Sequence, residues 1–117
     1  MDGRSRLGRA AEAIAARTLE RNGFEVIARN FRSGRGEIDL IARRGRTVVF
    51  CEVKCRTTDH FGAPAEAVHR KKQMTLRRTA AAWLRANPSS GVEARFDVVS
   101  VIFRGGRMEV AHIPSAF

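Results

Sequence analysis

An apolar stretch that ends in charges, VVFCEVKCR at residues 48–56, is the feature that most restricts how this chain can fold. In an extended strand, side chains alternate between the two faces of a sheet. One face of this strand is purely apolar and includes Val49 and Val53, whereas the other begins with Val48 and Phe50 and then becomes charged. The pattern predicts a buried, central strand with a charged end.

The charged end of this strand needs partners for Glu52, Lys54 and Arg56, which share one face. Burying an unpaired carboxylate or ammonium costs several kcal/mol even after relaxation. The preceding strand carries Asp39 in GEIDLI, and a tight turn at residues 44–45 would bring Asp39 and Glu52 to the same end of neighbouring strands. We therefore expect two carboxylates and a lysine to converge. An ordinary solvent-exposed pair of Glu52 and Lys54 is the alternative.

Paired carboxylates of this kind can hold Mg²⁺, or Mn²⁺ in its place, because hard divalent cations prefer oxygen ligands. A bound ion polarises a phosphoryl oxygen, while a nearby lysine orients a water or stabilises developing charge. Lysine is rare here, since only three of the 22 basic residues are lysines and the others are arginines. A compact ammonium at Lys54 therefore indicates a role that an arginine would not fill.

Two helices and five strands are predicted along the chain. The first helix runs from an N-cap at Ser5 to about Asn22 and is closed by Gly23, and the second runs from about Ala65 to Ala86. Strands are expected at residues 24–31, 37–43, 47–56, 95–103 and 108–113. The order αβββαββ implies an α/β fold in one domain over residues 1–117, with a mixed five-stranded sheet flanked by helices and the first three strands in an antiparallel meander.

Each helix carries one further candidate for the charged site. Glu12 lies among small residues on the first helix, which would let it deliver a carboxylate to the edge of the sheet. A solvated Glu12 paired with an arginine is the alternative. Lys72 falls at helical spacing with Leu76 and Thr79, on or beside the inward stripe, whereas Lys71 points elsewhere. The alternative for Lys72 is a stem that lies along apolar surface.

A formal net charge of +10 predicts a polyanionic partner, with nucleic acid first and DNA ahead of RNA. The basic residues that we expect to contact it are Arg56, Arg70, Arg77 and Arg78. A surface that is merely rich in arginine, and a structural partner of an acidic protein, are the alternatives. No 18-residue apolar run and no secretory signal are present, which predicts a cytoplasmic protein without a membrane span.

The chain resembles the YraN family of small bacterial proteins. The resemblance rests on Gly8, Glu12, Gly23, Asn30, GEIDLIA at residues 36–42, CEVKCR at residues 51–56 and RFDVV at residues 95–99. That family is similar to the PD-(D/E)XK nuclease superfamily, which includes restriction endonucleases and archaeal Holliday junction resolvases. The resemblance implies a restriction-endonuclease-like core and Mg²⁺-dependent hydrolysis of DNA in repair or recombination.

Residue roles follow from this resemblance position by position. Asp39 and Glu52, with the backbone carbonyl of Val53, would hold the divalent metal. Lys54 would orient the attacking water or stabilise charge on the phosphate, and Glu12 would add a helix-borne acid. Lys72 would be a further polar residue of the site. Branched or single-stranded DNA is a candidate substrate, and the shape of the substrate stays open. A homodimer, which would suit symmetric cuts in a four-way junction, also stays open. A nucleic-acid-binding protein that does not cut is the alternative function.

Overall fold

The computed structural model describes residues 5–57 and 68–117 of the chain. The elements, in chain order, are α1 Arg6–Arg21, β1 Glu25–Ser33, β2 Gly36–Arg44, β3 Thr47–Arg56, α2 Arg70–Ala86, β4 Glu93–Arg104 and β5 Arg107–Ile113. The strands form one sheet in the order β1-β2-β3-β4-β5. β3 and β4 are parallel and the other neighbouring pairs are antiparallel. The predicted order, meander and mixed sheet of a restriction-endonuclease-like core are confirmed.

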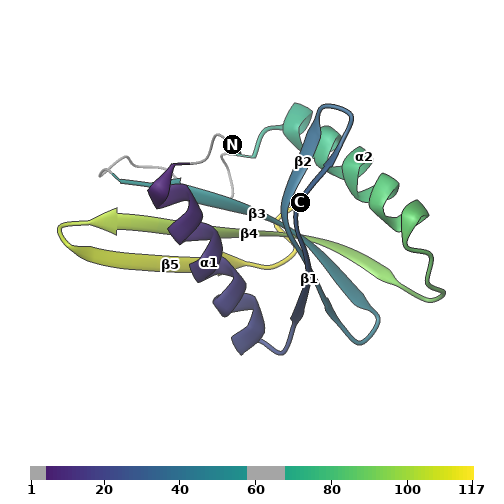
Figure 1. Cartoon of the computed structure of the whole chain (residues 1–117), viewed down its shortest axis with the longest axis horizontal. Helices are drawn as coiled ribbons and strands as arrows, with labels where there is room; N and C mark the ends of the chain where they lie inside the picture. Colours follow the sequence, from purple (N-terminus) through teal and green to yellow (C-terminus); the bar gives the residue numbers. More distant parts are fainter. Residues whose placement is uncertain (1–4, 58–67) are drawn as a thin grey trace.

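The two helices pack against opposite faces of the sheet. In Figure 1, α1 crosses in front of β3, β4 and β5, and α2 lies beside the β1–β2 hairpin. Val49 and Cys51 of β3 belong to the apolar cluster that includes the buried side of α1. Val48 and Phe50 belong to the cluster that includes the buried side of α2. The alternation read from the sequence therefore separates two cores, and β3 is buried on both faces.

Both ends of α1 follow the prediction. The Ser5 side chain accepts a hydrogen bond from the Gly8 N–H at 2.9 Å, which satisfies one of the free donors at a helix N-terminus. The helix is followed by Gly23 with φ of +84°, a conformation that glycine adopts without a steric penalty. These local signals require no tertiary contact, which is why they could be read from the sequence.

The predicted start of α2 at about Ala65 is wrong within the described residues, because Val68 and His69 precede the helix; residues 65–67 lie outside the described part of the chain. His69 has an extended backbone, with φ of −68° and ψ of 158°, and acts as the N-cap. The Gln73 side chain donates to the Val68 carbonyl at 2.9 Å. Val68 is buried in the core beneath α2 in spite of its non-helical backbone. In the sequence, a buried Val68 therefore looks like a residue on the apolar side of a helix.

The start of β2 lies so close to α2 that only glycine fits at residue 36. A Cβ added to Gly36 would overlap Thr79 Oγ1, and Thr79 is itself buried and donates to the Thr75 carbonyl at 2.8 Å. We expect Gly36→Ala to lower the free energy of unfolding by about 1–3 kcal/mol, the usual cost of overpacking. Urea denaturation followed by circular dichroism measures the change.

A second substitution distinguishes this contact from a general loss of stability. Thr79→Ala removes the hydroxyl that the new methyl group meets, so Gly36→Ala and Thr79→Ala together should cost less than the sum of the single changes. An unchanged urea midpoint for Gly36→Ala, or strict additivity in the double variant, would show that the contact between β2 and α2 is looser than described.

Candidate metal centre

The candidate site begins where the ladder between β2 and β3 stops. Their pairing runs from Arg44↔Thr47 to Leu40↔Cys51 and goes no further. The next residues in this register are Asp39 and Glu52, which therefore lie opposite each other where the strands separate. Figure 1 shows β2 turning away from β3 towards α2. The predicted meeting of these two carboxylates is the central feature of the site, which we call the fork.

Asp39 lies at an irregularity in β2 that directs it into the fork. Ile38 belongs to the core on the α2 side and Leu40 to the core on the α1 side, although residues two apart in a regular strand share a face. Asp39 Oδ2 accepts a hydrogen bond of 2.8 Å from the Val53 N–H of β3. The carboxylate thus replaces the backbone carbonyl that a continued ladder would have offered, and it joins the two separating strands.

The fork is electrostatically unfavourable for two charged carboxylates. Burial, followed by the charge of Glu52, hydrogen bonding with Glu52 and the more distant charge of Glu12, raises the pKa of Asp39 from 3.8 to about 8, against the opposing effect of the Val53 N–H. At neutral pH the proton on Asp39 therefore relieves part of the repulsion. A divalent cation would relieve it more completely, since it attracts both carboxylates.

Glu52 is buried, and the basic group that meets it comes from α2. The distance from Lys72 Nζ to Glu52 Oε2 is 3.1 Å. Glu52 is 7% exposed, whereas about half of the Lys72 side chain is exposed. Lys72 is therefore in direct contact with the fork, which the prediction of a place on or beside the inward stripe left open, while Lys71 is exposed. The Lys72 ammonium offsets one of the two carboxylate charges.

Lys54 lies beyond Glu52 on the α2 side of β3, and its side chain is half-buried. In the parallel ladder it is the partner of Ser100 on β4. Ser100 is buried, and its Oγ has no hydrogen-bond partner in the described part of the chain. Buried hydroxyls usually have a hydrogen-bond partner, so Ser100 marks an unsatisfied polar position beside Lys54 in the described part of the chain.

The Glu12 carboxylate is held by Asn30, a residue of the family resemblance for which no role was predicted. Asn30 Nδ2 donates to Glu12 Oε1 at 3.2 Å. Arg29 and Phe31 pair with the two neighbours of Asp39, so Asn30 lies opposite Asp39 on β1. Asn30 also has φ of +51°, a left-handed conformation that asparagine tolerates better than most residues. The family resemblance includes Asn30 but assigns it no role, and its preference for this conformation is a second signal in the sequence at this position.

The fork offers few oxygen ligands, which suits a magnesium ion that keeps several waters better than a metal ion that needs a full set of protein ligands. In residues 5–57 and 68–117, no three His, Cys, Asp or Glu side chains converge closely enough to hold a metal ion by themselves. Mg²⁺ is usually held by one or two carboxylates, with waters and substrate oxygens completing its shell. Asp39, Glu52 and the Val53 carbonyl match that smaller donor set.

The four arginines predicted to contact nucleic acid have different surroundings. Arg70 and Arg78 are exposed on α2, and Arg56 is half-buried at the end of β3. The Arg77 guanidinium stacks over the rings of Phe96 and Phe117, at 4.8 and 5.6 Å from their centroids. Arg77 therefore takes part in packing the C-terminus against α2, in addition to contributing its charge.

Known proteins are similar to this sequence over nearly its full length. The uncharacterised protein family UPF0102 matches residues 11–101. The chain belongs to the UPF0102 family. A UPF0102 protein of Geobacter metallireducens is 44% identical over 95% of this chain and 91% of its own length. Relatives from Parafrankia sp. and Beutenbergia cavernae are each 46% identical, over 96% and 97% of this chain and the same shares of their own.

UPF0102 is the YraN family that the motifs resemble, and its match includes the fork and the other predicted catalytic residues. Glu12, Asp39, Glu52, Lys54 and Lys72 all lie within residues 11–101. In the described residues of this UPF0102 chain, no helix is both long and apolar enough to cross a bilayer.

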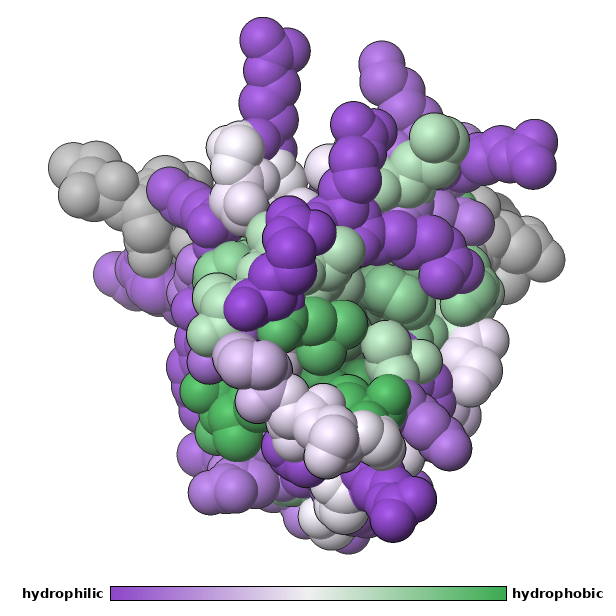
Figure 2. Space-filling model, turned by 90° about the vertical axis from the view of Figure 1, so that its right-hand side faces the viewer, coloured by the Kyte–Doolittle hydropathy of each residue, from purple (hydrophilic) through white to green (hydrophobic). Residues whose placement is uncertain are grey.

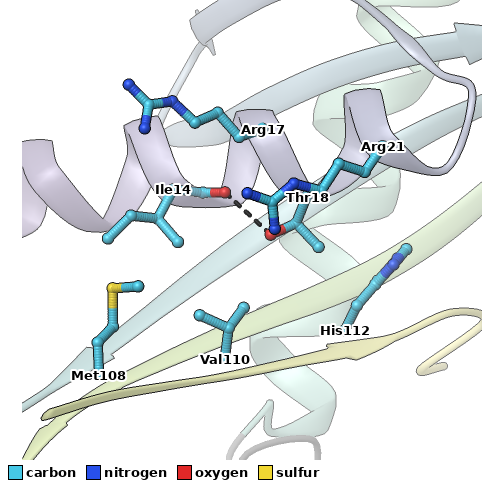
Figure 3. Close-up of a pocket in the computed structure, with 7 residues that line it drawn as sticks. All are labelled: Ile14, Arg17, Thr18, Arg21, Met108, Val110 and His112. Carbon is cyan, nitrogen blue, oxygen red and sulfur yellow. Dashed lines mark hydrogen bonds between the residues drawn. The ribbon is translucent and has the colours of Figure 1, made fainter.

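A pocket of the UPF0102 chain, of about 320 Å³, lies between α1 and β5. Figure 3 shows Ile14, Thr18 and Arg21 on α1 facing Met108, Val110 and His112 on β5, with Arg17 directed away from the strand. Helix geometry places Ile14 and Thr18 on the side of α1 away from Glu12. This pocket is therefore separate from the fork.

The buried Asp97 of β4 is a polar centre whose role the sequence analysis did not predict. Its carboxylate accepts two hydrogen bonds from Arg95, of 2.9 and 2.8 Å, and one of 3.1 Å from the Ser115 N–H. His112 Nε2 lies 2.7 Å from Asp97 Oδ2. Asp97 thus connects β4 to β5 and to the C-terminal residues, which explains the acid in the RFDVV motif as a structural one.

Proposed function

We propose that this UPF0102 protein is a Mg²⁺-dependent endonuclease that hydrolyses phosphodiester bonds of DNA, with a role in repair or recombination. The observation that carries the proposal is the fork, where Asp39 and Glu52 meet beside Lys54 and Lys72 at the end of an otherwise apolar strand. Stability alone does not explain this arrangement, since a hydrophobic pair would cost less to bury.

The chain supplies the parts that phosphodiester hydrolysis requires. Asp39, Glu52 and the Val53 carbonyl would hold Mg²⁺ or Mn²⁺, which when bound polarises a phosphoryl oxygen and lowers the pKa of a water. Lys54 orients the attacking water or stabilises charge on the phosphate. Asn30 holds Glu12 so that its carboxylate faces the Asp39 side of the site. Lys72 keeps Glu52 in place through their ion pair.

The ion pair between Lys72 and Glu52 also favours a second function. Because the ammonium neutralises one carboxylate, the fork is partly balanced without any metal. A nucleic-acid-binding protein that does not cut would need only this partial neutralisation of the buried carboxylates and the net charge of +10. Metal binding separates the two functions, because a protein that only binds has no need to bind Mn²⁺ through Asp39 and Glu52.

Cleavage of a labelled panel tests the endonuclease. The panel contains single strand, duplex, flap, four-way junction and RNA, each with Mg²⁺ or Mn²⁺. We expect metal-dependent cutting of DNA, reduced about 10²- to 10³-fold in Lys54→Ala, the usual cost of removing one group that stabilises transition-state charge. Lys71→Ala is the matched control, since Lys71 is exposed and outside the fork. Binding of the panel without any cutting would favour the second function.

A further inference from the structure

A groove of about 490 Å³ lies between the β1–β2 turn and α2, on the α2 side of the fork. Small residues line most of it, namely Ser33, Gly34, Gly36, Thr75, Thr79, Ala81 and Ala82. The remaining lining residues are Arg35 on the turn and Arg78 and Arg85 on α2. The base of the groove is therefore formed by small side chains, with arginines on the turn on one side and on α2 on the other.

Every charged side chain among the described residues that line the groove is basic. Arg35, Arg78 and Arg85 are exposed, and no acidic side chain is among the lining residues that the structure describes. Figure 2 shows long hydrophilic side chains projecting at the top of the molecule, where α2 and the β1–β2 hairpin lie in Figure 1. Three guanidinium groups on two walls suit a repeated anion, because each can pair with a separate phosphate.

The groove also leads to the fork. Lys72, which contacts Glu52, lies one helical turn before Thr75 on the groove side of α2. On the other wall, Gly36 lies three residues before Asp39, which is roughly 10 Å along a strand. A nucleic-acid strand advances about 3.4 Å per nucleotide in B-form DNA, so the end of the groove lies about three nucleotides from the fork.

We propose that this groove binds the sugar–phosphate backbone of duplex DNA beside the bond that is cut; the inference rests on the proposed nuclease function. The floor of glycine, alanine and threonine lets the backbone approach closely, and the three arginines bind its phosphates. Among the described residues that line the groove, none is aromatic, so unpaired bases have no ring there to stack on, which favours a duplex over a single strand. The contacts are to phosphates, so they carry no sequence preference.

The salt dependence of binding tests this groove without any metal. Binding of duplex and of single-stranded DNA is measured in EDTA over a range of salt concentrations. The wild type is compared with a variant that carries Arg35→Gln, Arg78→Gln and Arg85→Gln. The control variant has Arg17→Gln, Arg21→Gln and Arg107→Gln, which removes the same charge from exposed arginines on α1 and β5. Circular dichroism and the melting temperature show whether each variant is folded.

Each duplex phosphate contact contributes about 0.9 to the slope of log K against log salt. We therefore expect the slope to fall in magnitude by about 2.7 in the groove variant, which loses three arginines, and by less than about 1 in the control. An equal fall of the slope in both variants would show that the groove arginines contribute only to the overall positive charge, and it would overturn the proposal. An unchanged duplex slope with a weakened single-strand slope would overturn the choice of duplex. Because cleavage is not measured here, a failure of the nuclease function in the panel is a separate result.

Discussion

Replacing Asp39 with asparagine should abolish metal binding at the fork and lower DNA cleavage by at least about 10²-fold. Asparagine has nearly the same shape and keeps an oxygen that can accept the Val53 N–H, so the connection between β2 and β3 persists. What is lost is the negative charge that a divalent cation needs. Calorimetric titration with Mn²⁺ and cleavage of the preferred panel member measure the two effects.

The same substitution should not destabilise the metal-free protein. The raised pKa of Asp39 means that, between pH 3.8 and about 8, the folded chain keeps a proton at this carboxyl that the unfolded chain has released. Its contribution to stability is therefore present at low pH and is lost as pH rises through that window. Asp39→Asn removes this loss, and we expect its melting temperature in EDTA at pH 8 to equal or slightly exceed that of the wild type.

Glu37→Gln is the control for Asp39→Asn, because Glu37 is a carboxylate on the same strand that pairs with Arg32 away from the fork. It should bind Mn²⁺ and cut DNA as the wild type does. An Asp39→Asn protein that is fully active, or that binds Mn²⁺ with unchanged affinity, would remove the case for a metal centre at the fork.

Replacing Asp97 with asparagine should cause the largest loss of stability, about 3–5 kcal/mol, the usual cost of breaking a buried ion pair. Asp97 is fully buried and receives hydrogen bonds from Arg95, His112 and Ser115. An amide accepts fewer of these bonds, directs a donor at one of its neighbours and leaves the Arg95 charge without its partner. Urea denaturation at pH 7 measures the loss.

The pH dependence of stability identifies the charge of Asp97 as the cause. Burial would raise the pKa of Asp97, but hydrogen bonds from Arg95, His112 and the Ser115 N–H, with the charge of Arg95, outweigh it and hold the pKa below its ordinary value of 3.8. The contribution of the carboxylate is therefore present above pH 3.8 and is lost as pH falls through the lower folded-state value. Asp97→Asn should show a smaller loss of stability in acid than the wild type.

His112→Gln keeps this prediction testable if Asp97→Asn does not fold. It removes the imidazole from Asp97 but leaves the two bonds from Arg95, so its cost should be smaller, about 1–3 kcal/mol. A free energy of unfolding within about 0.5 kcal/mol of the wild type in both variants would show that the Asp97 contacts add little.

Short-range patterns were sufficient for the elements and for the two faces of the sheet. Ser5 and Gly23 mark the ends of α1 through backbone chemistry that depends only on neighbouring residues. The period of two in β3 predicted which side chains face α1 and which face α2. The start of α2 was predicted too early, because a buried Val68 has the same apolar signal in a helix and in an extended segment.

Residues far apart in the chain decided what the pattern could not. Asn30 is marked by its contact with Glu12, 18 residues away, and by its position opposite Asp39. Arg77 was predicted from charge alone, although in the fold it also packs on two aromatic rings. A linear sequence records which groups are present but not which distant groups share a desolvated space.

The order of the elements, the two apolar faces of β3 and the expectation that Asp39 and Glu52 lie at one end of neighbouring strands all follow from the amino-acid pattern alone. These properties depend on local periodicity and on a short turn, which leave few alternatives. The folded chain adds that the pairing of β2 with β3 stops at Leu40 and Cys51, that Asp39 accepts a hydrogen bond from Val53 and that Lys72 reaches Glu52. Where β2 leaves β3, its first residues pack against α2 through Gly36 and Thr79, and a contact between segments so far apart in the chain is a property of the whole fold.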